Sequence, residues 1–115
     1  MDLKTILKDG TNLPVEEHHF IRPPKLPYII YLKDDNIRGV SKDNLIIDSD
    51  ISVELYTSSP NKELENKVRN VIIDNIFSVS NNDEEIEIDQ NREYIESEQM
   101  YMTRFDFNLI EKGGN

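Results

Sequence analysis

A thirteen-residue alternation over residues 45–57 is the feature that most constrains this fold. Odd positions are mostly apolar and even positions mostly polar: Leu45, Ile47, Ser49, Ile51, Val53, Leu55 and Thr57 against Ile46, Asp48, Asp50, Ser52, Glu54 and Tyr56. A period of two predicts a β-strand with one face in a core and the other toward solvent or a partner. Strands usually have about 5–6 residues. We therefore expect an exceptionally long strand around which a sheet is built.

Three other segments predict strands. Residues 28–32 are apolar on both faces and predict a buried strand, whereas the polar residues 33–44 predict a long loop. Ile86 and Ile88 alternate with acids and predict a half-buried strand. Residues 99–110 predict the last strand. One of its faces carries Tyr101, Thr103, Phe105, Phe107 and Leu109, and the other carries Met100, Met102, Arg104, Asp106 and Asn108.

Two segments predict helices. Residues 2–9 carry an apolar stripe of Leu3, Ile6 and Leu7, and Gly10 is expected to end this first helix. The second helix is expected to open at the sequence Ser58-Ser59-Pro60, because hydroxyls suit an N-cap and proline suits a first turn. Its stripe consists of Leu64, Val68, Val71 and Ile72.

These elements give the order α-β-β-α-β-β in a single domain of residues 1–115. We predict an α+β fold: a two-layer sandwich with a mostly antiparallel sheet and one main helix packed on it. Residues 1–27 would form the N-terminal helix and a proline-rich arm, because the prolines at positions 23, 24 and 27 exclude a helix and an interior strand. Residues 28–110 would form the core, and residues 111–115 a flexible tail.

The charge excludes several classes of protein. The chain has 23 acidic and 13 basic side chains, a net charge of −10. A protein that grips bare nucleic acid or an anionic membrane needs a basic surface instead. The absence of cysteine excludes disulfides, thiol nucleophiles and cysteine zinc sites. No apolar run approaches the ~20 residues of a membrane span, and no signal peptide is expected.

The residues that carry chemistry elsewhere have ordinary explanations here. His18 and His19 are adjacent in an extended segment and point to opposite sides, so they do not suit one metal ion. The acidic stretch of residues 83–89 lacks the glycine and the ligand spacing of a calcium loop, and its alternation with isoleucine favours the wet face of a strand. Neither segment predicts a metal site.

The sequence also contains no motif that indicates a catalytic site. Ser58 and Ser59 lack the glycines of a nucleophile elbow, and no glycine-rich phosphate loop is present. For an unrecognised hydrolase, the best candidate residues would be Glu54, Glu96 and Glu98. We therefore expect a protein that is not an enzyme and that uses no cofactor.

Several pieces of the sequence, in this order, resemble one family of proteins. They are Leu13-Pro14-Val15, Pro23-Pro24-Lys25-Leu26-Pro27-Tyr28-Ile29-Ile30-Tyr31, Asp43-Asn44, Val53-Glu54-Leu55-Tyr56-Thr57, Leu64-Glu65 and Tyr94-Ile95-Glu96-Ser97-Glu98-Gln99-Met100-Tyr101. Together they are similar to the tail-completion or tail-terminator proteins at the head–tail joint of long-tailed phages and prophages. The likeness spans nearly the whole chain, and its specificity lies in the order and spacing of short motifs.

This resemblance implies a structural protein of the virion, made in the cytoplasm of the bacterial host. Such subunits form a ring, sixfold in long-tailed phages, at the head-proximal end of the tail. The implied partners are further copies of the chain, the tail-tube protein and the head connector, with DNA only passing through the channel and no membrane involved. The ring stops growth of the tube and uses no cofactor.

A second hypothesis comes from charge alone. Residues 83–98 hold eight acids against Arg92, so the chain is also a candidate acidic binding module that mimics DNA and inhibits a basic partner. In a sixfold ring the total charge would be about −60, which is tolerable if the acids face outward or line a channel. A negative channel would let DNA pass without binding it.

Three regions are candidate interaction sites. The first is the rigid proline arm, and the second is the predicted loop from Asp34 to Lys42. The third is the predicted exposed face on which Met102 lies, where we expect a new charge to block assembly without unfolding the subunit. Their candidate residues are Pro23, Pro24 and Pro27, then Asp34, Asp35 and Arg38, then Tyr56, Met100 and Met102.

Overall fold

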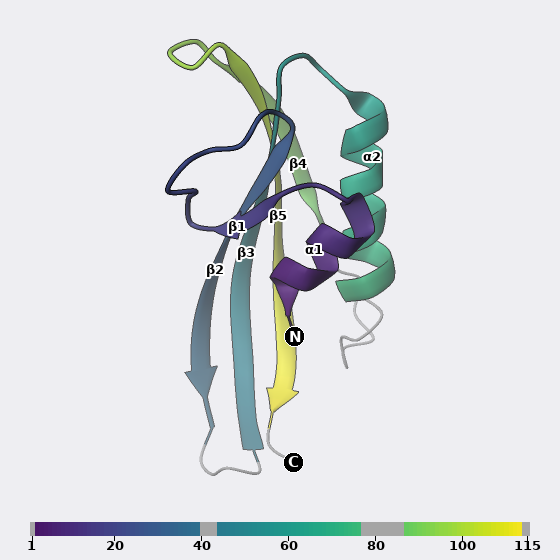
Figure 1. The fold of residues 1–115 in the computed structure, drawn as a ribbon. Helices are drawn as coiled ribbons and strands as arrows, with labels where there is room; N and C mark the ends of the chain where they lie inside the picture. Colours follow the sequence, from purple (N-terminus) through teal and green to yellow (C-terminus); the bar gives the residue numbers. More distant parts are fainter. Residues whose placement is uncertain (1, 40–43, 77–86, 114–115) are drawn as a thin grey trace.

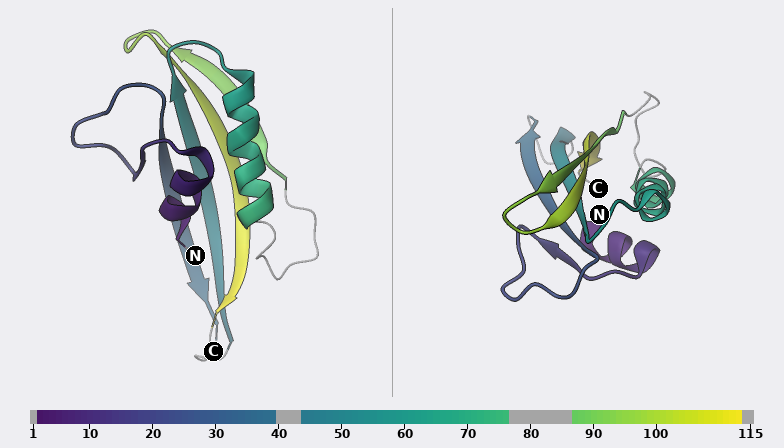
Figure 2. Two further views of the ribbon diagram at one scale, coloured as in Figure 1. Left: turned by 45° about the vertical axis from the view of Figure 1, so that its right-hand side comes forward. Right: turned by 90° about the horizontal axis from the view of Figure 1, so that it is seen from above.

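The computed structural model describes residues 2–39, 44–76 and 87–113 as one five-stranded sheet covered by helices on a single face (Figures 1 and 2). The strand order is β1-β2-β3-β5-β4. The elements in chain order are α1 (Leu3–Thr11), β1 (Val15–Glu17), β2 (Tyr28–Arg38), β3 (Leu45–Thr57), α2 (Lys62–Val71), the π-helical turn η2 (Ile72–Ile76), β4 (Asp89–Ile95) and β5 (Met100–Gly113). The predicted two-layer α+β fold is confirmed.

Strand β3 organises the sheet, as its alternation predicts. It has the predicted bounds and pairs along its whole length with β5, and along most of it with β2, both antiparallel. Its odd positions face the helices, where Ile51, Val53 and Leu55 are at most 2% exposed. The sheet extends past the helices at the end where β2 finishes and β3 begins (Figure 1), which gives the molecule its length of 48 Å.

The core lies between the helices and one sheet face, which we call the helix face. It draws on every described element of the fold except β4. Its members are Leu3, Leu7, Val15, Ile29, Tyr31, Ile51, Val53, Leu55, Val68, Val71, Ile72, Ile76, Phe105, Phe107 and Leu109. The predicted apolar stripes of both helices contribute to it.

Helix α1 ends later than predicted, because Gly10 has a packing role and does not cap the helix. A Cβ at Gly10 would lie 2.6 and 2.8 Å from the two γ-carbons of Val71, so glycine permits the close approach of α1 and α2. The left-handed cap residue is Asn12, with φ +60°, and its N–H donates to the carbonyl of Lys8 at 2.8 Å. Asparagine is the usual alternative to glycine at such a position.

Helix α2 also begins later than predicted. Its N-cap is Asn61, whose side chain accepts a hydrogen bond from the N–H of Leu64 at 3.0 Å. Ser58, Ser59 and Pro60 therefore lie before the helix and do not start it. The amide oxygen of an asparagine satisfies a free N–H of the first turn as well as a serine hydroxyl does.

The N-terminal half differs from the prediction in two places. Residues 33–38 are not a loop: β2 continues through them to Arg38 and pairs there with β3. Their polarity misled the interpretation, because this end of the strand lies beyond the helices and its residues 34–38 are exposed. The strand β1, unpredicted from the sequence, pairs in parallel with Ile29, Ile30 and Tyr31 of β2.

The C-terminal pair is close to the prediction. Strand β5 has the predicted alternation but runs on to Gly113, so residues 111–113 belong to the sheet and not to a tail. Strand β4 begins at Asp89, after the expected strand around Ile88, whose side chain packs against the core. Ile86 lies outside the described residues. A turn joins the two strands, with the N–H of Glu98 donating to the carbonyl of Ile95 at 3.2 Å.

Candidate interaction surfaces

The sheet face opposite the helices, here called the outer face, carries many polar side chains. Register places Asp34, Asp50 and Asn108 side by side on it, and Asn36, Asp48 and Ile110 in the next row. The acids of this face are Asp34, Asp48, Asp50, Glu54, Asp89, Glu93 and Asp106. Against them stand the guanidinium groups of Arg38 and Arg104. The outer face is therefore strongly acidic.

Hydrogen bonds organise part of this acidic surface. The side-chain amide of Asn108 donates to Asp48 at 2.6 Å and to Asp50 at 3.0 Å. Arg38 approaches Asp48 at 3.7 Å, but more than half of its side chain is exposed. An exposed ion pair of this kind is weak. The amide holds the two carboxylates in fixed positions without neutralising them.

At its other end, the outer face carries a small apolar cluster. Tyr28, Tyr56 and Met102 lie side by side on β2, β3 and β5. The rings of Tyr28 and Tyr56 stack with centroids 5.2 Å apart, and Phe20 meets Tyr28 edge-on at 5.3 Å. Phe20 belongs to the segment between β1 and β2, so that segment folds over this end of the outer face (Figure 1).

Met102 is the clearest correction to the predicted seam. Its side chain is 4% exposed, and it is not part of an open face. Tyr56 and Met100 are half-buried. Sequence alternation separates the two faces of a strand, but it does not reveal that a connecting segment and aromatic neighbours cover part of one face. A charge at Met102 is now expected to destabilise the subunit itself.

The proline arm is present as a surface loop of residues 18–27. Its base is fixed, since the N–H of His18 donates to the carbonyl of Tyr31 at 3.0 Å and that of His19 to Glu17 at 2.8 Å. Pro23 is exposed, whereas Pro24 and Pro27 are half-buried. Ile21 is 91% exposed. The role of this arm in binding remains a prediction.

Asp34, Asp35 and Arg38 do not belong to a loop, because all three lie in β2. Register places Asp34 and Arg38 on the outer face and Asp35 on the helix face. The hydroxyl of Ser49 donates to Asp35 at 2.5 Å, which lowers the pKa of that carboxyl. Residues 40–43, the rest of the predicted loop, lie outside the described residues.

Glu54 is buried although it lies on the outer face. It accepts hydrogen bonds from the Tyr56 hydroxyl at 3.0 Å and from Arg104 at 3.4 Å. Burial, followed by the charge of Glu54, raises the pKa of the Tyr56 hydroxyl. Glu96 and Glu98, the other hydrolase candidates, are exposed in the turn after β4. Glu54 is thus held in a structural network of its own strand and β5.

A second buried carboxylate, Glu65, was missed as a special residue. Its side chain accepts from Arg92 through Nε and Nη2, both at 2.7 Å, and from the Thr103 hydroxyl at 2.5 Å. The hydrogen bond from Arg92 is the main cause that lowers the pKa of Glu65. Glu65 lies three residues before Val68 and therefore on the apolar stripe of α2. A charged residue at that spacing was the sequence signal that could have predicted a buried, paired carboxylate.

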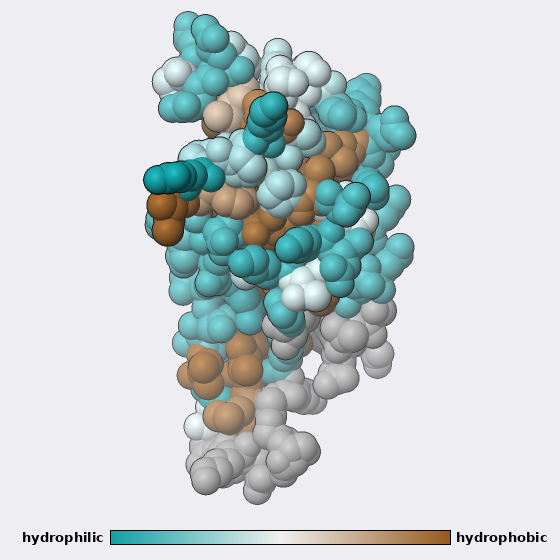
Figure 3. All heavy atoms as spheres, in the orientation of Figure 1, coloured by the Kyte–Doolittle hydropathy of each residue, from teal (hydrophilic) through white to brown (hydrophobic). Residues whose placement is uncertain are grey.

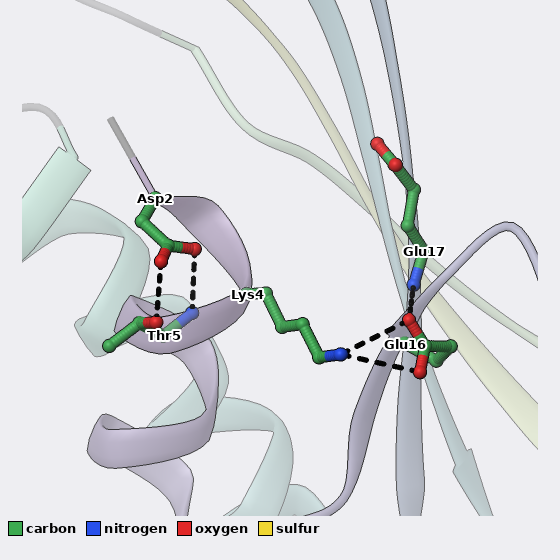
Figure 4. A network of polar contacts seen from close by, with 5 residues as sticks. All are labelled: Asp2, Lys4, Thr5, Glu16 and Glu17. Atoms are coloured by element: carbon green, nitrogen blue, oxygen red, sulfur yellow. Dashed lines mark hydrogen bonds and ion pairs between the residues drawn. The ribbon is translucent and has the colours of Figure 1, made fainter.

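At the other end of the helix layer, α1 is tied to β1 by a polar network (Figure 4). Lys4 lies 3.3 Å from both carboxylate oxygens of Glu16, and Glu16 also accepts from the N–H of Glu17 at 3.1 Å. The backbone bond from Glu17 is the first cause that lowers the pKa of Glu16. Asp2 caps the helix by accepting from the N–H and the hydroxyl of Thr5.

Much of the acidic stretch of residues 83–98 is described. Glu87, Asp89, Glu93, Glu96 and Glu98 are exposed, whereas residues 83–86 lie outside the described residues. Within the described ranges, no three His, Asp or Glu side chains gather as a metal site would require. Over the same ranges, no helix combines the length and apolar character needed to cross a membrane.

Apolar atoms also reach the surface. In Figure 3 they gather at the lower end of the sheet, below the helices. Among the described residues there, Ile37 is 61% exposed, and Leu45 and Ile47 are half-buried.

Neither the comparison with known protein families nor the comparison with curated proteins gives a match.

Proposed function

We propose that this chain is a structural subunit that forms a ring at the head-proximal end of a long phage tail, where it ends growth of the tail tube and joins the tail to the head connector. The acidic outer face is the observation that carries the proposal. A sheet with helices on one side and a row-ordered acidic surface on the other suits a channel wall.

The physical argument concerns DNA inside a ring. A channel that DNA must cross has to avoid holding it, and closely spaced carboxylates repel the phosphate backbone. The helix layer would then lie outside, and the acids of β2, β3 and β5 would face the lumen. The sequence resemblance to tail-completion proteins supports a ring at the head–tail joint.

Deletion of the gene in the phage that encodes the chain tests the proposal directly. Electron microscopy of the lysate is expected to show overlong tubes unattached to heads, and expression of the chain from a plasmid should restore normal virions. Gold-labelled antibody should mark the joint between head and tail. Tails of unchanged length that still carry heads would overturn the proposal.

A charge variant tests the role of the outer face. Replacing Asp34, Asp50 and Asp106 by asparagine is expected to leave assembly intact and to create DNA binding at low salt. The matched control replaces Asp9, Glu63 and Glu87 by their amides. These three residues are exposed and lie outside the rows of the outer face, and the control changes the net charge equally. Equal DNA binding by both variants would show that total charge matters and the face does not.

The same acidic face also suits a binding module that mimics DNA. That alternative predicts a one-to-one complex with a basic protein, and this complex should weaken steeply with salt. Pull-down from the host lysate at low and high salt separates the two functions. A ring with no such partner favours the tail protein, and a monomer in a salt-sensitive heterodimer favours the inhibitor.

A further inference from the structure

The sheet has two long edges that no described strand covers. Strand β1 pairs only with Ile29, Ile30 and Tyr31, which leaves the edge of β2 from residue 32 to residue 38 open. At the opposite side, β4 pairs with β5 alone, so its outer edge is open over Asp89–Ile95. The two open stretches have the same length, seven residues.

These edges carry no proline and no bulge, and two of their inward-pointing cations are already paired within the subunit. Isolated sheet edges are commonly blocked by proline, by bulges or by inward-pointing charges. Neither open stretch contains proline or glycine. The cation of Lys33 is engaged by Asp35 at 3.5 Å, and that of Arg92 by Glu65 at 2.7 Å.

Exposed apolar side chains gather on the same two edges. The large apolar residues that the described surface exposes are Ile21, Leu32, Ile37, Ile73 and Tyr94. Three of these five lie on the open stretches: Leu32 is 37% exposed, Ile37 61% and Tyr94 50%. Both edges therefore combine unpaired backbone with apolar surface.

The directions of the strands allow one edge to pair with the other on a second copy. β2 is antiparallel to β3, β3 to β5 and β5 to β4, so β2 and β4 run in opposite directions. Rotation about an axis along the strands keeps each strand's direction. It thus brings β4 of one copy antiparallel to β2 of the next, with the helix faces on the same side. Asp89 lies level with Leu32 across the sheet of one copy, so reaching residues 32–38 also takes a shift of about six residues along the strands.

One antiparallel register uses all seven residues and keeps every side chain on its own face. It places Leu32 opposite Ile95, Lys33 opposite Tyr94, Asp35 opposite Arg92, Ile37 opposite Gln90 and Arg38 opposite Asp89. The apolar side chains of Leu32 and Ile95 then meet. Asp35 faces Arg92 and Arg38 faces Asp89, so two pairs have opposite charges, whereas Asp34 and Glu93 form the one pair of like charges. Cross-strand pairs of these kinds each stabilise a sheet modestly.

We propose that copies of this chain join edge to edge, β4 of one copy adding to residues 32–38 of the next, so that one sheet continues through the assembly. Each copy carries both halves of this contact, which makes the contact heterologous. It closes into a ring where the strands are inclined to the ring axis so that the shift between copies is absorbed, and otherwise it gives an open helical filament. The closure itself rests on the proposed function. All outer faces then lie on one side of the continuous sheet.

Cysteine cross-linking tests the register, and the chain offers a clean background because it contains no cysteine. Two singly substituted chains are mixed, Leu32→Cys with Ile95→Cys and, separately, Lys33→Cys with Tyr94→Cys. Two adjacent pairs are needed because hydrogen-bonded and non-hydrogen-bonded pairs alternate and differ in spacing. At least one mixture should form a disulfide-linked dimer under mild oxidation. The control mixture, Asn36→Cys with Ile95→Cys, is four residues out of register and should not.

Surface variants test the same contact without cross-linking. Ile37→Lys and Tyr94→Lys should each weaken self-association at least tenfold in analytical ultracentrifugation. The matched controls are Ile21→Lys and Ile73→Lys, since these residues are exposed but lie off both edges. The controls should change the association constant less than twofold. Thermal unfolding verifies that all four variants are folded.

The outcomes separate this inference from the proposed function. Suppose that rings form, that no cysteine mixture gives a disulfide-linked dimer, and that Ile37→Lys and Tyr94→Lys do not weaken self-association. That result would overturn the edge contact but not the proposed function. Cross-linked open filaments that never close would support the edge contact and count against the tail ring. Chains that stay monomeric and uncross-linked at millimolar concentration would overturn the edge contact, and the tail lengths after gene deletion would still decide the function.

Discussion

Glu65 and Arg92, which are 27 residues apart in the chain, join α2 to β4 through two hydrogen bonds of 2.7 Å. Arg92 lies in the open edge strand, so this pair fixes the position of that strand against the helix layer. The Thr103 hydroxyl adds a third bond to the same carboxylate. A bidentate pair with a buried carboxylate is far stronger than an exposed surface pair.

Glu65→Gln is expected to lower the free energy of unfolding by about 2 kcal/mol at pH 7, because it removes the charge from hydrogen bonds to Arg92 and Thr103. The control is Glu63→Gln, at an exposed position of the same first turn. Its effect should stay within about 0.5 kcal/mol. Urea unfolding of the three proteins provides the measurement.

The same carboxylate predicts a pH dependence. Its pKa is lower in the folded chain than the ordinary 4.5, so its stabilising contribution is present above pH 4.5 and is lost as the pH falls through the folded pKa. The stability difference between the wild type and Glu65→Gln should therefore shrink below about pH 4.5. A difference that stays constant down to pH 3 would contradict this assignment.

Gly10→Ala is expected to destabilise the chain by about 1–3 kcal/mol through overpacking against Val71. Helix propensity alone predicts the opposite sign, since alanine favours a helix interior by about 1 kcal/mol. Calorimetric unfolding of Gly10→Ala, Val71→Ala and the double variant tests the contact. The double variant should be more stable than the sum of the single effects predicts.

Met102→Ala is expected to cost about 2–3 kcal/mol, because the side chain is almost fully buried beside Tyr56. Met102→Glu should fail to give a folded subunit, as judged by circular dichroism. The half-buried Met100 provides the control, and Met100→Ala should cost less than about 1 kcal/mol. A folded Met102→Glu subunit that cannot assemble would instead support the seam first expected at this position.

Phe20→Ala should loosen the loop of residues 18–27 without unfolding the sheet, since an edge-on aromatic contact such as that with Tyr28 is worth about 0.5–1.5 kcal/mol. Trypsin is the probe, and the reporter is cleavage after the exposed Lys25. Cleavage there should be about 2–10 times faster than in the wild type, because losing about 0.5–1.5 kcal/mol of contact energy raises the population of the opened loop by that factor. The control is Ile21→Ala. Ile21 lies next to Phe20 but is 91% exposed, so its truncation should leave the cleavage rate unchanged.

The sequence predicts best where a regular pattern is long. The bounds of β3 and the stripe of α2 follow from periodicity, because burial on one face demands it. Residues 33–38 were misread since a strand beyond the helices needs no apolar face. Glu65 and Met102 show the complementary limit: Glu65 is buried against Arg92 and Thr103, and Met102 is buried beside Tyr56 on the neighbouring strand. Both depend on tertiary contacts that the local sequence does not reveal.

The central position of β3 has a consequence for the order of folding. Two pairs, β2 with β3 and β4 with β5, are hairpins that can form locally within microseconds. The pair of β3 and β5 instead joins Thr57 to Tyr101 and must close a chain segment that contains α2. Such long-range closure slows folding. We therefore expect the two hairpins to form first and to dock last along β3 and β5. The two edges that we propose to join copies would then exist before the subunit is complete.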